Sequence, residues 1–193
     1  MQKLLIGAVL GVCATFSAQA ADAAAPFKFV LGAGLTFGGD TLANVTYTDG
    51  TTDSIKAGGL FALYGGGEFR VGDAVSLQAT IGYHVDDTKA ASNGSVKFSR
   101  YPVDLLAYYH LNDKFRLGAG AQFVNSPKLH GSGVASNINM SFESTTGVVL
   151  EGEYLFNPKM GLKVRAVTEK FKPTGSSVST NGNHVGVMFN FYL

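Results

Sequence analysis

The sequence predicts an all-β chain: an eight-stranded antiparallel transmembrane β-barrel, built as an up-and-down meander and preceded by a cleavable signal peptide. In the last eleven residues, 183–193, five apolar side chains share one parity: Val185, Val187, Phe189, Phe191 and Leu193. Because successive strand residues point to opposite faces, this stretch is a strand with one apolar face. Connections between such strands alternate between long and short, and aromatic residues gather near the strand ends. Both features are typical of membrane barrels.

The N-terminal segment has the features of a secretory signal peptide. Lys3 supplies the basic start, residues 4–16 the apolar run, and Ala18-Gln19-Ala20 the cleavage site. The apolar run is too short to span a bilayer as a helix, and Val12 stands where lipidation of Cys13 would need a small residue. We therefore expect a signal peptide at 1–20, a flexible lead at 21–26 and one barrel domain at 27–193.

The composition bounds the function. Removal of residues 1–20 takes away the only cysteine and leaves 14 basic and 14 acidic side chains. A cysteine-free exported chain needs no disulfide bonds, and a balanced charge gives no reason to expect a nucleic-acid partner. The 25 glycines, 14 phenylalanines and 8 tyrosines, with only 5 prolines, favour an all-β chain with aromatic anchoring.

Four strands are predicted in the first half of the barrel domain from the alternation of apolar and polar residues. They span 27–37, about 55–69, 75–85 and about 96–111. In the fourth, for example, Tyr101, Val103 and Leu105 oppose Arg100 and Asp104. The connections are a long polar loop at 39–54, which has room for a small hairpin, a short turn at 71–73 and a second long loop at 86–95.

Four more strands are predicted in the second half, at 115–123, about 140–156, 160–169 and 183–193. In the sixth strand the apolar face comprises Phe142, Val148, Leu150, Tyr154 and Phe156, and the opposite face carries Glu143, Glu151 and Glu153. Short turns at 112–113 and 157–158 alternate with glycine- and serine-rich long loops at 125–139 and 172–183. We expect the four long loops to lie outside the cell and the short turns in the periplasm.

Aromatic residues on the apolar faces form two predicted girdles. The periplasmic girdle comprises Phe27, Phe29, Phe69, Tyr109, Phe115, Tyr154, Phe156, Phe189 and Phe191; the outer girdle comprises Phe37, Phe61, Tyr83, Tyr101, Phe123 and Phe142. A soluble barrel has its apolar face inside. Here the charges share the face opposite the girdles, so the apolar face is predicted to meet lipid.

Taken together, these features resemble the small outer-membrane β-barrel family, which includes outer-membrane protein X and the transmembrane domain of outer-membrane protein A. The pattern His184-x-Gly186-x-x-Phe189-x-Phe191 resembles the signal that barrel-assembly machinery recognises, although Leu193 stands where the family usually ends in Phe. The resemblance implies a bacterial outer-membrane location, with periplasmic chaperones and the assembly machinery as partners during biogenesis. It also implies a C-terminal assembly signal comprising Gly186, Phe189, Phe191 and Leu193.

The lumen face carries charges that should pair. An eight-stranded barrel is just wide enough for side chains to fill it, and an unpaired buried charge is costly. The 157–158 turn places Glu153 opposite Lys163 and Glu151 opposite Arg165, and the 112–113 turn places Arg116 opposite His110. We expect a lumen charge network comprising Arg100, Asp104, Arg116, Glu151, Glu153, Lys163 and Arg165. This network is either an internal plug or, as the open alternative, a gate along a narrow ion path.

Three other patterns are weaker indications of function. His130-Gly131-Ser132, with Glu143 downstream, resembles the His-x-Ser arrangement of lipid A deacylase barrels, but Gly133 stands where that family has Asn and the motif lies in a flexible-looking loop. The glycine-rich run at 32–38 has dinucleotide-loop spacing without a following helix. The four histidines lack metal-ligand spacing.

We expect a monomeric, non-enzymatic protein, without cofactor or metal, that has a structural or surface-interaction role through its four external loops. The alternatives are a narrow small-solute or ion pore and a lipid A-modifying enzyme. Expected partners are the lipid bilayer and lipopolysaccharide, with no nucleic acid. Five lysines are candidates to contact lipopolysaccharide phosphates, unless they are simply solvated loop charges: Lys89, Lys97, Lys128, Lys170 and Lys172.

Overall fold

A computed structural model describes residues 26–46, 50–88 and 94–193. The predicted signal peptide, most of the flexible lead and Lys89 lie outside these residues. Within them, no helix is long and apolar enough to cross a membrane. The same residues form thirteen strands: β1 (Phe27–Gly38), β2 (Thr41–Thr46), β3 (Thr52–Lys56), β4 (Leu60–Arg70), β5 (Val75–Asp87), β6 (Gly94–His110), β7 (Phe115–Gly133), β8 (Asn139–Ser141), β9 (Thr145–Asn157), β10 (Met160–Thr168), β11 (Lys170–Phe171), β12 (Thr180–Asn181) and β13 (His184–Tyr192).

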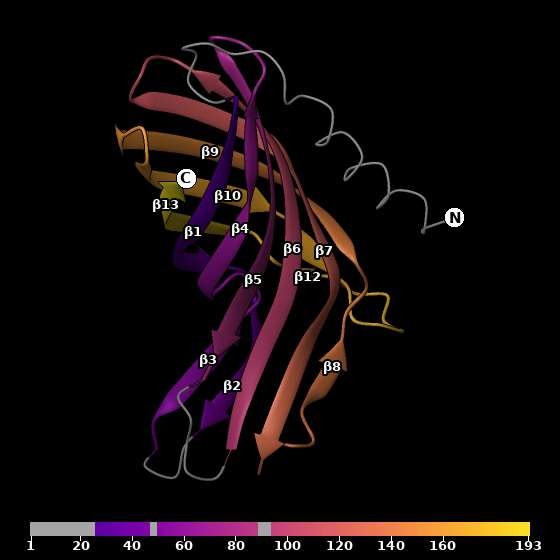
Figure 1. Ribbon diagram of the computed structural model, residues 1–193. Helices are drawn as coiled ribbons and strands as arrows, with labels where there is room; N and C mark the ends of the chain where they lie inside the picture. The colour runs from indigo at the N-terminus through magenta and orange to yellow at the C-terminus, as the bar shows by residue number, and fades with distance from the viewer. Residues whose placement is uncertain (1–25, 47–49, 89–93) are drawn as a thin grey trace.

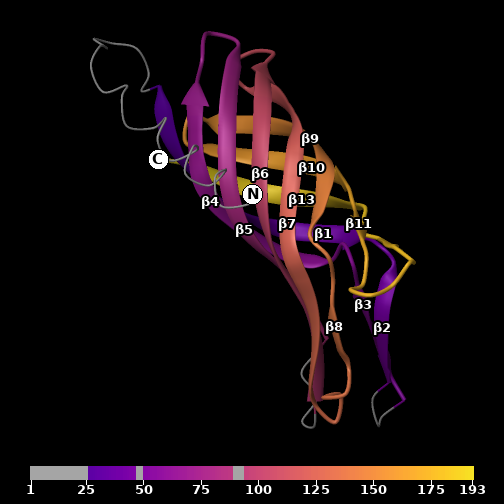
Figure 2. The same ribbon diagram turned by 90° about the vertical axis from the view of Figure 1, so that its right-hand side faces the viewer.

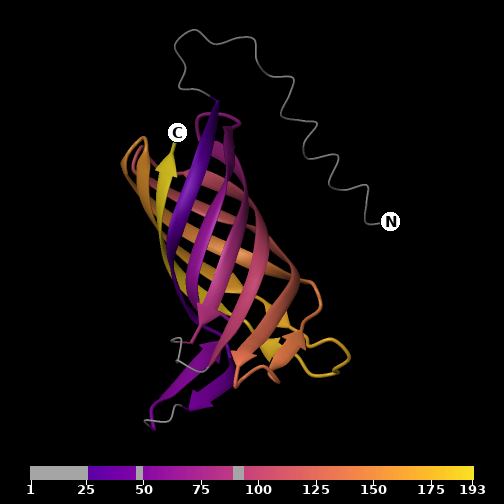
Figure 3. The ribbon, with the colours of Figure 1, turned by 60° about the horizontal axis from the view of Figure 1, so that its bottom comes forward.

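Eight long strands close into an antiparallel barrel (Figures 1 and 3). They pair in the order β1, β4, β5, β6, β7, β9, β10 and β13, and β13 returns to β1. Each strand pairs with the next long strand along the chain, so the predicted eight-stranded meander is confirmed. At the closing seam, Phe29 and Leu193 exchange backbone hydrogen bonds of 2.9 Å in both directions. The last residue therefore completes the ladder that begins at β1.

The outward face of the barrel is apolar, as the alternation predicts. Ile81 is 63% exposed and Val164 57%, whereas Lys163 and Arg165 beside it in sequence are buried. At the end that carries the C-terminus, aromatic rings form a continuous row across β7, β9 and β13: Phe115, Tyr154, Phe156, Phe189 and Phe191, with centroid spacings of 4.8–6.2 Å. These five residues are members of the predicted periplasmic girdle.

The predicted start of the second barrel strand, at about residue 55, is wrong. Ile55 belongs to β3, which pairs with β2 in a hairpin outside the barrel ladder, and the barrel strand β4 starts only at Leu60. Ile55 is fully buried, and Gly58 and Gly59 separate the two strands. The apolar residue that suggested a barrel strand instead anchors the hairpin. Figure 2 shows this hairpin projecting beyond the barrel at the end opposite the C-terminus.

The predicted loop 125–139 and the start of the sixth strand also need correction. β7 continues through the predicted loop to Gly133 and pairs there with β6 and with the short β8, so this region projects as a sheet (Figure 2). β9 starts at Thr145, after an interruption at 143–144. Alternation cannot be extended across such a break. Phe142, predicted in the outer girdle, is therefore buried, and Glu143, predicted in the lumen, is exposed.

Candidate functional site: the barrel lumen

The end of the lumen nearest the C-terminus is crossed by Arg116. Its guanidinium donates to Glu68 at 2.7 Å, to Glu153 at 2.9 Å and to the Tyr192 hydroxyl at 2.5 Å. Asn190 adds a bond of 2.8 Å to Glu153. Arg116, Glu153 and Tyr192 are each at most 3% exposed. Residues of β4, β7, β9 and β13 therefore meet across the lumen at one level, which we call the inner tier.

A middle tier is built around Arg165. Its Nε donates to Glu151 at 2.7 Å and its terminal nitrogen to Asp104 at 2.5 Å, so one side chain links β10 to β9 and β6. Lys163 lies 2.9 Å from the second oxygen of Glu151, which also accepts from the Tyr108 hydroxyl. Gln122 donates to Asp104 at 2.8 Å. Each charge in this tier has an opposite charge in contact, the condition under which buried ions are tolerated.

The predicted register around this tier is confirmed. Glu153 lies opposite Lys163, and Glu151 lies opposite Arg165. At the 112–113 turn, Arg116 lies opposite His110. Two of the ion pairs follow the register, Arg165 with Glu151 and Arg116 with Glu153 of the neighbouring strand. Lys163 instead contacts Glu151 diagonally, because its long side chain reaches a neighbour along the strand.

An outer tier surrounds Arg100, which is fully buried. The guanidinium donates to the Ala57 carbonyl and lies 3.3 Å from His84 Nε2, which in turn is 2.6 Å from the Thr36 hydroxyl. Glu169 is the nearest carboxylate at 3.9 Å, and it lies 3.5 Å from His184. The Arg100–Ala57 bond fastens the base of the β2–β3 hairpin to the barrel wall. Arg100 thus belongs to a separate cluster from the other six predicted network residues.

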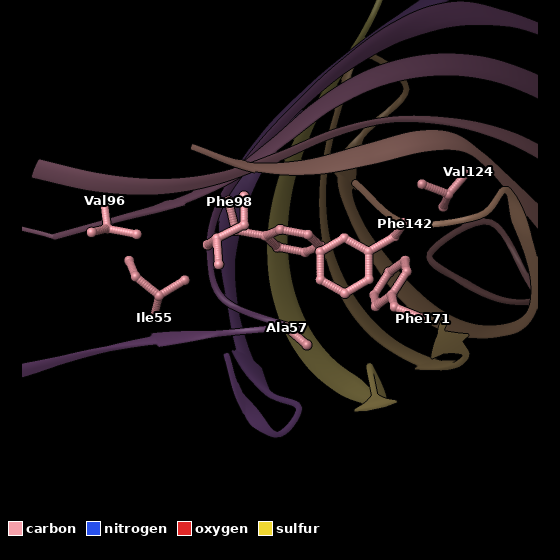
Figure 4. Packing of buried hydrophobic residues seen from close by; sticks show 8 residues of the cluster. Ile55, Ala57, Val96, Phe98, Val124, Phe142 and Phe171 are labelled. Carbon is pink, nitrogen blue, oxygen red and sulfur yellow. The ribbon is translucent and has the colours of Figure 1, made fainter. Parts of the chain in front are cut away.

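An apolar cap closes the outer end of the lumen beyond Arg100. The rings of Phe98, Phe142 and Phe171 meet edge to face with centroids 5.4–6.2 Å apart. Figure 4 shows Ile55 and Val96 on one side of these rings and Val124 on the other. All six side chains are at most 3% exposed. Aromatic pairs in this arrangement add stability beyond the area they bury, so the cap is a packed core.

A cavity of about 470 Å³ occupies the end of the lumen nearest the C-terminus. Lys28, Arg70 and His110 line its wall, and Arg116 and Tyr192 of the inner tier form its floor. The cavity is a vestibule that ends at the Arg116 ion pairs.

The residues of the predicted deacylase motif have separate partners. His130 Nδ1 lies 2.7 Å from the Asn139 side-chain oxygen, Ser132 Oγ lies 3.0 Å from Ser95 Oγ, and Glu143 pairs with Lys172 at 3.1 Å. A nucleophilic serine needs an imidazole in hydrogen-bond contact and a carboxylate that orients it. This geometry does not bring the three together. Within the described ranges, no group of three histidine or acidic side chains could hold a metal ion.

The predicted C-terminal signal residues are divided between the two faces of β13. Phe191 is 45% exposed and Leu193 69%, both on the outward face, and Phe189 is half-buried within the periplasmic aromatic row. Gly186 faces the lumen between β1 and β10, opposite Thr36 and Arg165. The bulky members of the pattern therefore lie on the lipid side of the closing strand.

Sequence reasoning missed several members of the lumen network. All of them are polar side chains on the lumen-facing parity of their strands, and that parity was the available signal. The missed residues are Glu68, Tyr108, Gln122, Glu169, Asn190 and Tyr192. Their partners lie on strands that meet only when the barrel closes. Glu68 and Arg116, for example, are 48 residues apart.

Comparisons with known proteins agree with this geometry. The model of a family described as "Outer membrane protein beta-barrel domain" matches residues 8–191. Among solved structures, the chain is similar to Ail, the attachment invasion locus protein of Yersinia pestis, with a TM-score of 0.53, 12% identity and coverage of 86% of this chain and 97% of that one. Neisserial surface protein A gives a TM-score of 0.52, 10% identity and coverage of 88% and 99%. At this identity the likeness shows the fold alone. The search of curated proteins gives no match.

Proposed function

The chain belongs to the outer-membrane β-barrel family, and from this premise we propose that it is a sealed, monomeric barrel of the bacterial outer membrane whose function lies in its outer hairpins. The observation that carries the proposal is the filled lumen: two tiers of paired charges, the Arg100 cluster and the aromatic cap follow one another along the barrel axis. A lumen filled in this way serves as internal support for the wall. A continuous water path would require breaking ion pairs at several levels.

The outer end of the molecule supports a surface-interaction role. The β2–β3 hairpin and the extended β6–β7–β8 sheet project beyond the barrel (Figure 2). They present apolar side chains to solvent, including Val134 at 73% exposure and Met140 at 44%. Isolated exposed apolar residues are common on surfaces, but rigid projecting sheets offer a fixed framework for a binding partner. The proposal includes no catalytic step, in keeping with the separate partners of His130 and Ser132.

The leading alternative is a narrow pore, and conductance separates the two functions. We expect the folded protein, inserted into planar bilayers, to give no discrete conductance steps, because the inner-tier and middle-tier ion pairs block water and ions. Heat-modifiable migration on gels confirms that the inserted protein is folded, and a large porin in the same bilayer confirms that insertion can be detected. Reproducible ohmic steps from the wild-type chain would show that the plug opens and that the pore is the correct function.

We also propose that β13 is the segment recognised by periplasmic chaperones and barrel-assembly machinery. The exposure of Phe191 and Leu193 on the lipid side supports this, because both side chains are accessible before the seam with β1 forms. Replacing Leu193 with Phe is expected to speed assembly by reconstituted machinery while leaving the urea midpoint of the folded barrel unchanged. Phe191→Ala is the matched variant and should slow assembly. If neither substitution alters the assembly rate, β13 is not the recognised segment.

A further inference from the structure

A basic patch faces outward on β6 and β7, just beyond the outer aromatic girdle. Lys97 of β6 lies opposite His130 of β7, and Lys128 lies two residues closer to the membrane on the same face, opposite Ser99. Below them Tyr101 contacts Tyr83, with ring centroids 5.3 Å apart. Lys97, Ser99 and Tyr101 share one parity, and their alternating partners on β6 are buried. The patch is therefore continuous with the lipid-facing surface.

A bulge in β7 places Lys128 and His130 on this face. Below the bulge, the odd-numbered residues of β7, such as Phe123, face lipid and the even-numbered residues, such as Gln122, face the lumen. The register shifts between Ser99 and Tyr101, and Ser126 on β7 has a positive φ of 44°. Beyond this point the even-numbered residues are exposed. The extra residue of a bulge reverses which parity faces out, so without it both basic side chains would point inward.

The two lysines of the patch form no close ion pair with a described residue. Among the residues that the structure describes, no carboxylate lies within ion-pair distance of Lys97 or Lys128, although Asp87 is opposite Lys97 on β5. By contrast, the exposed Lys172 pairs with Glu143 at 3.1 Å. Side chains of Ser95, Ser132 and Asn139 on the same face add hydrogen-bonding groups. Lys128 thus presents a positive charge with no carboxylate in ion-pair contact, and the charge of Lys97 is offset in part by the Asp87 carboxylate opposite it.

The depth of the patch identifies what covers it. Aromatic girdles of membrane barrels lie at the interface between hydrocarbon and headgroups, so a residue one or two pairs beyond Tyr101 lies at headgroup level. Basic side chains at a membrane surface attract anionic headgroups, and lysine is a common phosphate ligand. We propose that Lys97, Lys128 and His130 bind a phosphate of lipopolysaccharide in the outer leaflet. This inference rests on the outward orientation of the hairpins in the proposed function.

Binding can be measured by native mass spectrometry of the folded, full-length mature protein in detergent, titrated with bisphosphorylated lipid A. The Lys97→Gln, Lys128→Gln double variant is expected to bind lipid A roughly 10- to 30-fold more weakly, about fivefold per lysine. Lys128→Arg should retain binding. The matched control is Lys114→Gln with Lys159→Gln, which removes the same charge from the exposed periplasmic turns. That control should bind as the wild type does.

Dephosphorylated lipid A and phosphatidylglycerol distinguish the sources of attraction. The wild type should prefer bisphosphorylated lipid A over both. Equal binding of the dephosphorylated form, or equal losses in the outer and periplasmic double variants, would overturn the inference. Orientation is tested separately by labelling Val134→Cys, which lies outside the basic patch in the turn after β7, on intact cells with a membrane-impermeant thiol reagent. Absence of labelling contradicts the orientation in the proposed function. Labelling without phosphate-dependent binding contradicts only the lipopolysaccharide site.

Discussion

Replacing Arg165 with methionine is expected to lower the free energy of unfolding of the barrel by about 3–5 kcal/mol. Arg165 is 5% exposed and makes ion pairs with Asp104 at 2.5 Å and Glu151 at 2.7 Å. Methionine fills similar volume without a charge. Asp104 then keeps only its bond from Gln122, and Glu151 keeps Lys163 and Tyr108. The large effect comes from leaving a carboxylate buried without its cation, a penalty that exceeds the net value of the intact pair.

Urea titration of the barrel folded into lipid vesicles measures this change, with gel migration as a second probe of folding. Lys172→Met is the matched control, since its partner Glu143 is also a glutamate but the pair is exposed. Exposed pairs contribute about 0–1 kcal/mol. Adding Asp104→Asn to Arg165→Met should recover part of the loss, because it removes one of the stranded charges. If Arg165→Met costs no more than Lys172→Met, the middle tier does not support the fold.

The fold could be predicted within the membrane because two opposite environments act on every spanning strand. Lipid selects apolar residues on one face and the packed lumen selects polar ones on the other, so parity alone gave the strand faces from β1 to β13. Turn positions then gave the register, including Glu151 opposite Arg165. Both inferences are local and need only the period of two that strands impose.

Prediction failed outside the membrane, where that double constraint ends. Ile55 and Phe142 follow the alternation, yet both side chains are buried in the outer cap. A hairpin in one case and a chain interruption in the other changed the relation between sequence parity and face. The bulge at Ser126 had the same effect on Lys128 and His130. The loop 39–54 was expected to have room for a hairpin, but the extent of that hairpin, the interruption and the bulge have no strong signal in a single sequence.

The candidate site was predicted in part. Six of the seven predicted network residues meet in the inner and middle tiers, because charges on one lumen face have few other places to go. Their partners across the barrel were not predictable, since the distance between strands depends on closure and shear. Arg100 shows this most clearly. It was expected in one network with Asp104, but it binds the Ala57 carbonyl at the base of the β2–β3 hairpin and lies over the Phe98 ring.

Glu169 is a buried acidic group of the outer tier that lacks a hydrogen-bond donor among the described residues. It follows the last residue of β10, three positions beyond Ala166, which is in register with Val185 and, through it, with Phe37 of the outer girdle. It therefore lies beyond the spanning segment. Neither carboxylate oxygen accepts a hydrogen bond from a described residue. Burial raises the pKa of Glu169 to about 7, against the lowering effect of Arg100; Asp104 raises it further and Arg165 lowers it.

This raised pKa sets the sign of a pH effect. In the unfolded chain the Glu169 carboxyl releases its proton near its ordinary pKa of 4.5. Between that pH and about 7, the folded state binds more protons than the unfolded state, so the stability due to this group falls as pH rises through the window. Glu169→Gln keeps the side chain neutral at all pH values. We therefore expect the variant to be more stable than the wild type at pH 8, by up to about 3 kcal/mol, and equally stable near pH 4.5.

This expectation is tested by measuring the urea midpoints of both proteins in vesicles from pH 4.5 to pH 8. The difference between the midpoints of the variant and the wild type should grow with pH. Glu143→Gln is the matched control, because its carboxylate is exposed beside Lys172; its difference from the wild type should stay small and flat across the same range. A Glu169→Gln difference that does not change with pH would mean that Glu169 is ionised normally in the folded barrel. The carboxylate would then need a donor that Arg100 at 3.9 Å and His184 at 3.5 Å do not supply. A pH-dependent gain would instead show that the outer tier carries a carboxyl group that is neutral in acid and strained when charged. The stability of the seal beneath the aromatic cap would then depend on the pH outside the cell.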